Sequence, residues 1–82
     1  MKLLKFQASW CQPCKMLTAT LKDLELPFDV TEIDIDEDMD TAMKYGVRGV
    51  PTLILLDDEG KQLVTNVGSL TKQQFIDKFL NL

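Results

Sequence analysis

Apolar and polar residues alternate along this chain with two periods, one typical of strands and one of helices. Residues 2–8 alternate at every second position, which predicts a strand. From residue 11 to about 25 the apolar residues recur at helical spacing, and Pro27 ends that region before a second alternating run at 28–35. The helical positions expected to face the core are Met16, Leu17, Leu21 and Leu24.

The same change of period occurs in the middle of the chain. A short helix is expected at 39–45, where Met39 and Met43 have core spacing and Gly46 can take the left-handed conformation that ends a helix. The continuous apolar run 53–56 predicts a strand that is covered on both faces.

The last third of the chain predicts a hairpin partner and a final helix. Residues 61–67 are expected to pair back on the preceding strand, and Thr71 with Gln74 forms a capping box that starts a helix. Its inward positions are Phe75, Ile76, Phe79 and Leu80. The order βαβαββα predicts one α/β domain covering residues 1–82, with a four-stranded mixed sheet flanked by helices.

Composition and charge exclude several classes of function. A formal net charge of −4 offers no basic face to a phosphate backbone, so nucleic acid is not expected as a partner. No apolar run has the length of a membrane span, and Leu3-Leu4 is too short for a signal-peptide core, so we expect no membrane association and a cytoplasmic location. Histidine is absent, which removes His-ligated zinc and imidazole bases.

Both cysteines of the chain, Cys11 and Cys14, lie where the first strand gives way to the first helix. When the second thiol is in the first turn of a helix, the turn brings the two β-carbons within reach of a disulfide. A loop this short constrains the unfolded chain little, so such a bond would be a poor source of stability. In the cytosol the pair is expected to be redox-active or metal-binding rather than structural.

The expected helix makes the two sulfurs unequal. Cys11 lies at the N-terminal edge, where free N–H groups and the helix dipole favour the thiolate and lower the pKa of this thiol below the free value of about 8.5. Cys11 is therefore the expected nucleophile, and Cys14 would resolve the mixed disulfide. Pro13 suits the first turn of a helix, where its missing N–H costs nothing, and Trp10 adds an aromatic surface beside Cys11.

Two motifs show that the chain resembles the thioredoxin family. They are Trp10-Cys11-Gln12-Pro13-Cys14-Lys15, preceded by Phe6 and Ala8, and Tyr45-Gly46-Val47-Arg48-Gly49-Val50-Pro51-Thr52. A C-x-x-C alone also serves metal sites, but the aromatic before it, the proline inside it and the later Gly-Val-Pro-Thr make the match specific. The resemblance runs from about residue 2 to the end, and implies a minimal thioredoxin or glutaredoxin-like protein that lacks the N-terminal β-α unit of the full-length family.

The resemblance implies a protein-disulfide oxidoreductase whose redox group is the Cys11–Cys14 pair, with no other cofactor and no metal. Pro51 matches the family's cis-proline, which presents the backbone of Val50 to an extended substrate; the alternative is a plain strand-entry proline. Gln12 stands where glycine is more usual and is expected to change the redox potential. The expected substrate surface consists of Trp10, Gln12, Pro13, Val50, Pro51 and Gly68.

The chain departs from the family in a pair of charges. Typical thioredoxins have a buried aspartate six residues before the first cysteine and a lysine nineteen residues before the cis-proline, where this chain has Lys5 and Glu32. We expect a partly buried Lys5–Glu32 ion pair beneath Cys14, because an isolated charge there would be costly. Lys5 would stabilise a Cys14 thiolate, and Glu32 could take the proton. The alternative is two solvated charges at the edge of the fold.

The resemblance also implies partners. Disulfide-containing proteins would be the substrates, ribonucleotide reductase among them, and either thioredoxin reductase or glutathione would be the electron donor to a monomeric protein. Val67-Gly68-Ser69 offers one glycine where glutaredoxins have two. A thioredoxin-like protein is therefore favoured over one that uses glutathione. The remaining alternatives are a metal carrier and a non-catalytic binding module that keeps the fold.

Overall fold

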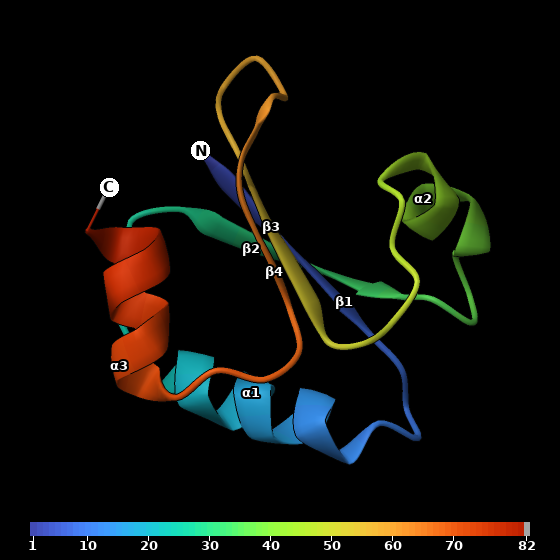
Figure 1. Cartoon of the computed structure of the whole chain (residues 1–82), viewed down its shortest axis with the longest axis horizontal. Helices are drawn as coiled ribbons and strands as arrows, with labels where there is room; N and C mark the ends of the chain where they lie inside the picture. Colours follow the sequence, from blue (N-terminus) through green and yellow to red (C-terminus); the bar gives the residue numbers. More distant parts are fainter. Residues whose placement is uncertain (82) are drawn as a thin grey trace.

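The computed structural model describes residues 1–81 and has the predicted order of strands and helices (Figure 1). The elements are β1 (Lys2–Gln7), α1 (Gln12–Lys22), β2 (Asp29–Asp34), α2 (Met39–Lys44), β3 (Thr52–Leu56), β4 (Gln62–Val67), α3 (Lys72–Phe75) and a π-helical turn η1 (Ile76–Leu80) that continues α3. The four strands form one mixed sheet with the spatial order β2-β1-β3-β4.

The sheet is parallel on one side of β1 and antiparallel on the other. Strand β1 pairs in parallel with β2, and the register places Lys5 opposite Glu32. It pairs antiparallel with β3, which in turn pairs antiparallel with β4. Because β1 and β3 are the two inner strands, both of their faces are covered, and every residue of β3 is buried as the apolar run predicts.

Two groups of side chains form the core, one on each face of the sheet. Figure 1 shows α1 and α3 on one side of the sheet and α2 on the other. The face under α1 and α3 buries Leu3, Leu17, Leu21, Leu53, Leu55, Phe75 and Phe79. The face under α2 buries Leu4, Phe6, Ile33, Ala42, Ile54 and Leu56.

The helices bury fewer residues than their apolar spacing predicts. Helix α1 ends at Lys22 rather than near residue 25, and Met16 is 63% exposed although it was predicted to face the core. Met39 and Met43 are exposed too, since α2 turns Ala42 toward the sheet. A short helix that lies on a flat sheet covers a narrow stripe, so the flanking apolar positions stay in solvent.

The helix ends follow the capping signals in the sequence. The capping box of Thr71 and Gln74 is formed at the start of α3, and Gly46, with φ of 70°, follows α2 as expected. Asp38 caps α2, and hydrogen bonds from the hydroxyl and the amide of Thr41 hold the pKa of this carboxyl below its ordinary value. Within residues 1–81, no helix has the length and apolar character needed to cross a membrane.

Candidate active site

The cysteine pair lies at the junction of β1 and α1, as predicted. Cys11 is the N-cap of α1, Pro13 is in the first turn, and the Cys11 sulfur accepts a hydrogen bond from the backbone N–H of Cys14 over 3.2 Å. Cys11 and Cys14 form a disulfide with their Cα atoms 5.3 Å apart. Both residues are buried in this oxidised state. The helix N-terminus therefore directs a backbone N–H at the sulfur that was predicted to be the nucleophile.

The peptide bond between Val50 and Pro51 is cis, as the resemblance implied. Val50 packs against the cluster of Ala8, Cys11 and Cys14, so the loop before β3 lies beside the disulfide. Among the described residues, no hydrogen bond occupies the backbone N–H or C=O of Val50. Those two groups are free to pair with an extended chain.

Two further residues of the predicted surface are fixed by hydrogen bonds. The N–H of Gly68 donates to the carbonyl of Pro51 over 2.9 Å, which joins the end of β4 to the cis-proline. The indole Nε1 of Trp10 donates to the Asp36 carboxylate over 2.9 Å, while 67% of the Trp10 surface stays exposed. Asp36 was not identified from the sequence, because its reach to Trp10 depends on how the loop after β2 folds back toward the cysteines.

Lys5 and Glu32 form the predicted ion pair. The Lys5 ammonium lies 3.3 Å from Glu32 Oε1 and also donates to the hydroxyl of Thr18. Lys5 is 1% exposed, whereas the side chain of Glu32 is 53% exposed. The lysine is thus a core residue, and the carboxylate reaches solvent.

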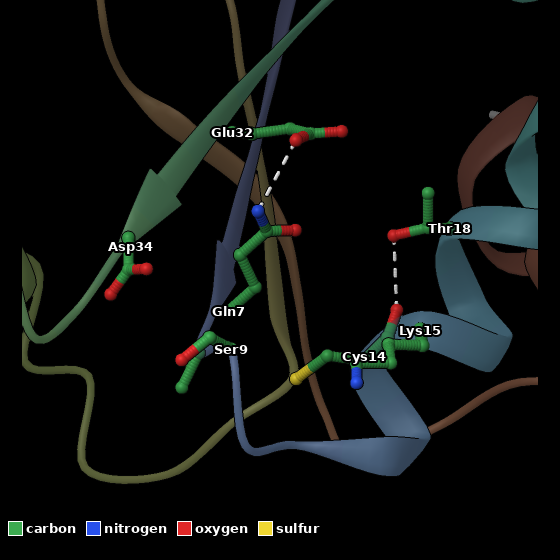
Figure 2. A pocket seen from close by; sticks show the side chains of 8 residues that line it. Gln7, Ser9, Cys14, Lys15, Thr18, Glu32 and Asp34 are labelled. Atoms are coloured by element: carbon green, nitrogen blue, oxygen red, sulfur yellow. Dashed lines mark hydrogen bonds between the residues drawn. The ribbon is translucent and has the colours of Figure 1, made fainter.

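Thr18 and Gln7 extend this pair toward Cys14. The Thr18 hydroxyl donates to the carbonyl of Cys14 over 3.0 Å, and Gln7 Nε2 donates to Glu32 Oε2 over 3.2 Å (Figure 2). Neither residue was identified from the sequence, although Thr18 follows Cys14 by one helical turn and Gln7 follows Lys5 on the same face of β1. A side chain that bonds Cys14 could have been sought one helical turn after it, and one that bonds the ion pair could have been sought two residues after Lys5 on the strand.

An open pocket of about 330 Å³ lies between Glu32 and Cys14. Its lining residues are Gln7, Ala8, Ser9, Cys14, Lys15, Thr18, Glu32 and Asp34. Figure 2 shows the Glu32 and Gln7 side chains facing Cys14 and Thr18 across this space. The pocket is therefore a place where water can connect the Glu32 carboxylate with the sulfur of Cys14.

The chemistry that this loop can perform is set by its two sulfurs. Within the part of the chain that the structure describes, no group of three or more histidine, cysteine, aspartate or glutamate side chains is placed to hold a metal ion. Two thiols that can form a disulfide with each other within this fold can exchange two electrons with another disulfide. A protein with this fold and this exchange site is a dithiol–disulfide oxidoreductase.

Within that class, the chain belongs to the thioredoxin family, whose family model matches residues 1–81. The thioredoxin of Buchnera aphidicola subsp. Baizongia pistaciae is 45% identical to it, over 98% of this chain and 75% of that protein. The thioredoxin of Bacillus subtilis is 40% identical, over 95% of this chain and 81% of its own length.

Solved structures agree with this assignment. A mutant thioredoxin from Halobacterium salinarum NRC-1 matches with a TM-score of 0.85 and 41% identity, and the match covers 93% of this chain and 68% of that one. Thioredoxin 1 from Thermosipho africanus TCF52B has the same fold, with a TM-score of 0.80 over 99% of this chain and 92% of its own at 24% identity.

Proposed function

We propose that Cys11 and Cys14 of this thioredoxin-family protein divide the reduction of protein disulfides between them. The Cys11 thiolate attacks one sulfur of the substrate and releases the other as a thiolate, which leaves a mixed disulfide. Cys14, as a thiolate, then attacks the Cys11 sulfur, forms the Cys11–Cys14 disulfide and releases the second substrate thiol. The observation that carries this division is the placement of Cys11 as the N-cap of α1, with Cys14 in the first turn.

The substrate surface that we propose surrounds Cys11. Trp10, Gln12 and Pro13 adjoin the cysteines in the chain and are exposed, and Val50, which precedes Pro51, packs against the disulfide. The free backbone groups of Val50 support the binding of an extended segment, because they offer one donor and one acceptor to its main chain. Gly68, which is bonded to Pro51, completes the rim.

Lys5 and Glu32 serve Cys14 in this proposal. The buried ammonium of Lys5 is held by Thr18, whose hydroxyl is bonded to the Cys14 carbonyl, so two hydrogen bonds connect this positive charge with the backbone of the resolving cysteine. Such a charge favours the thiolate that resolution requires. Glu32 lines the pocket that Cys14 also lines and reaches solvent, so it can take the Cys14 proton through water. Lys5 and Glu32 thus carry charges opposite to those that typical thioredoxins have at these two positions.

The partners that we propose are disulfide-containing proteins as substrates and a protein donor of the thioredoxin reductase kind. The relatives named above are thioredoxins, which supports this donor over glutathione. Ribonucleotide reductase is one substrate to examine. We propose that the protein works as a monomer in the cytoplasm, where cellular reductants keep dithiols reduced.

The proposed exchange is tested by the fluorescence of Trp10, the sole tryptophan, in mixtures of oxidised and reduced dithiothreitol. We expect one reversible two-electron transition, because Trp10 adjoins the disulfide. A midpoint near −270 mV would identify a reductant of the thioredoxin kind, whereas one near −120 mV would identify an oxidant.

The Cys11→Ser variant is the control, and its transition should disappear. If the parent protein shows no transition, the cysteines do not exchange and the proposed function is wrong. Tight stoichiometric binding of Cu(I) or zinc by that protein would then indicate a metal carrier. Unchanged biological function in the Cys11→Ser, Cys14→Ser double variant would indicate a binding module.

A further inference from the structure

Asn66, near the end of β4, is held at both ends of its side-chain amide. Its Oδ1 accepts a hydrogen bond from the Lys78 ammonium over 2.9 Å, and its Nδ2 donates to the carbonyl of Gly68 over 3.1 Å. We propose that Asn66 is a positioning residue for substrate binding, because it fixes the Gly68 rim beside Pro51. The proposal rests on the substrate surface assigned above and adds a residue that does not belong to it.

The Asn66 contact completes the fixation of Gly68. The N–H of Gly68 is already bonded to the Pro51 carbonyl over 2.9 Å, so Asn66 occupies the other backbone group of this glycine. Gly68 has φ of 97°. Glycine can adopt this conformation and many others at similar energy. A glycine that lacked one of these bonds would sample those alternatives and move the rim next to Val50.

The position and chemistry of residue 66 both suit this task. In the β3–β4 register, Asn66 lies opposite Leu53, which is in the core under α1 and α3, whereas the next residue, Val67, lies opposite Thr52 and is exposed. Residue 66 therefore faces the C-terminal helical segment that carries Lys78. An amide has one acceptor and one donor group, so it can satisfy Lys78 and Gly68 at once, which a carboxylate or an aliphatic side chain cannot do.

This arrangement predicts an effect on substrate affinity rather than on chemistry. Asn66 has no hydrogen bond to either cysteine among residues 1–81, and neither of its two partners is on α1: Gly68 is bonded to Pro51, and Lys78 belongs to η1. Loss of the Gly68 bond should loosen the rim and weaken the pairing of an extended substrate. The equilibrium between the Cys11–Cys14 disulfide and dithiol should stay as it is.

The test compares three variants of the full chain. Asn66→Asp keeps an acceptor for Lys78 but places a carboxylate against the Gly68 carbonyl. Lys78→Met removes the lysine contact and leaves the Gly68 bond in place. Gln62→Ala, at the far end of β4, is the control for substitution on this strand. Each variant is assayed with insulin as a disulfide protein and with 5,5′-dithiobis(2-nitrobenzoic acid) as a small disulfide, and its midpoint potential is measured through Trp10.

Asn66→Asp should raise the KM for insulin about threefold to tenfold, which is the worth of one neutral hydrogen bond. Its kcat, its rate with the small disulfide and its midpoint potential should match those of the parent, and the Gly68 amide should exchange hydrogen faster. Lys78→Met and Gln62→Ala should keep the parent KM within twofold. The proposal is overturned if Asn66→Asp leaves the KM unchanged, if the small disulfide is slowed equally, or if Lys78→Met has the same effect. A parent protein without a redox transition would refute the proposed function instead.

Discussion

Lys5 is the residue whose position in this fold most needs a physical explanation. An ammonium group at the centre of a sheet is costly unless hydrogen bonds and an opposite charge replace its water. Thr18 and Glu32 provide these contacts. Glu32 remains half in water, so the attraction between the two charges is screened and adds little to stability. A charge retained in the core with so small a benefit to folding is better explained by the effect on Cys14 that we propose for it.

That explanation predicts a separate effect from each of two substitutions. Lys5→Met should move the pH–rate profile of the Cys14 resolving step upward by roughly one pH unit, because the thiolate loses a nearby cation. Glu32→Gln should slow the same step at neutral pH, because the proton acceptor is lost. The measurement is the decay of a preformed mixed disulfide on Cys11 as a function of pH.

Lys22→Met is the matched control for Lys5→Met, since Lys22 is an exposed lysine on α1. Its profile should coincide with that of the parent. If both Lys5→Met and Glu32→Gln also reproduce the parent profile, the pair has no role in resolution and its position is only structural.

At the scale of the elements, short helices depend on their end groups. Helix α3 has four residues before the backbone changes to the π-helical turn η1, so intrahelical hydrogen bonds alone stabilise it weakly. Thr71 accepts from the N–H of Gln74 over 3.1 Å, and the Gln74 side chain accepts from the N–H of Thr71 over 2.9 Å. The capping box therefore holds the first turn, which brings Phe75 and Phe79 to the core.

Removal of this cap has a calculable cost. Thr71→Ala should lower the free energy of unfolding by about 1 kcal/mol, because the N–H of Gln74 loses its acceptor. Urea denaturation followed by circular dichroism measures the change. Thr20→Ala is the same substitution inside α1, where the hydroxyl bonds the Met16 carbonyl, and it should cost less because alanine favours a helix interior. An equal loss in the two variants would contradict the importance of the cap.

At the scale of the whole molecule, a single sheet separates two small cores. Helix α1 contributes to one of them through Leu17 and Leu21, and the same helix positions the cysteines at its N-terminus. The packing of α1 on the sheet thus fixes where the disulfide lies relative to the cis-proline that precedes β3. Stability and active-site geometry depend on the same contacts.

Substitutions at neighbouring positions of α1 should therefore differ sharply in how much they lower the free energy of unfolding. Leu17→Ala should lower the free energy of unfolding by about 2–5 kcal/mol, because it opens a cavity in the core. Met16→Ala should change that free energy by less than about 0.5 kcal/mol, since Met16 is largely exposed. Urea denaturation of the two variants measures both values. Similar losses would show that Met16 is buried in solution, as its spacing in the sequence suggests.

Much of the fold could be predicted from local signals. The order of elements, the capping box at Thr71 and the glycine that ends α2 each depend on residues close in the chain. The depth of burial was harder to predict, because helical spacing shows that a helix has an apolar stripe but not how wide a stripe its neighbours cover. Met16, Met39 and Met43 were assigned to the core for this reason and are exposed.

The candidate site divides in the same way. The Cys11–Cys14 pair and its place at a helix start could be derived from the sequence, and the resemblance supplied the cis-proline. The contacts of Thr18 with Lys5, of Asp36 with Trp10 and of Asn66 with Lys78 could not be found, because each joins segments that only the tertiary fold brings together. Hydrogen bonds between side chains have short range, so they depend on positions accurate to a fraction of an ångström.

The sequence by itself determined the order of strands and helices and the place of the cysteine pair, because the periods of its apolar residues and the spacing of its cysteines are local properties that follow from backbone geometry. The class of the protein followed from the resemblance of its two motifs to the thioredoxin family. It also placed opposite charges at positions 5 and 32. Only the tertiary structure decided that Lys5 is buried while Glu32 reaches water, since burial depends on what the parallel β1–β2 pairing and helix α1 place around each side chain.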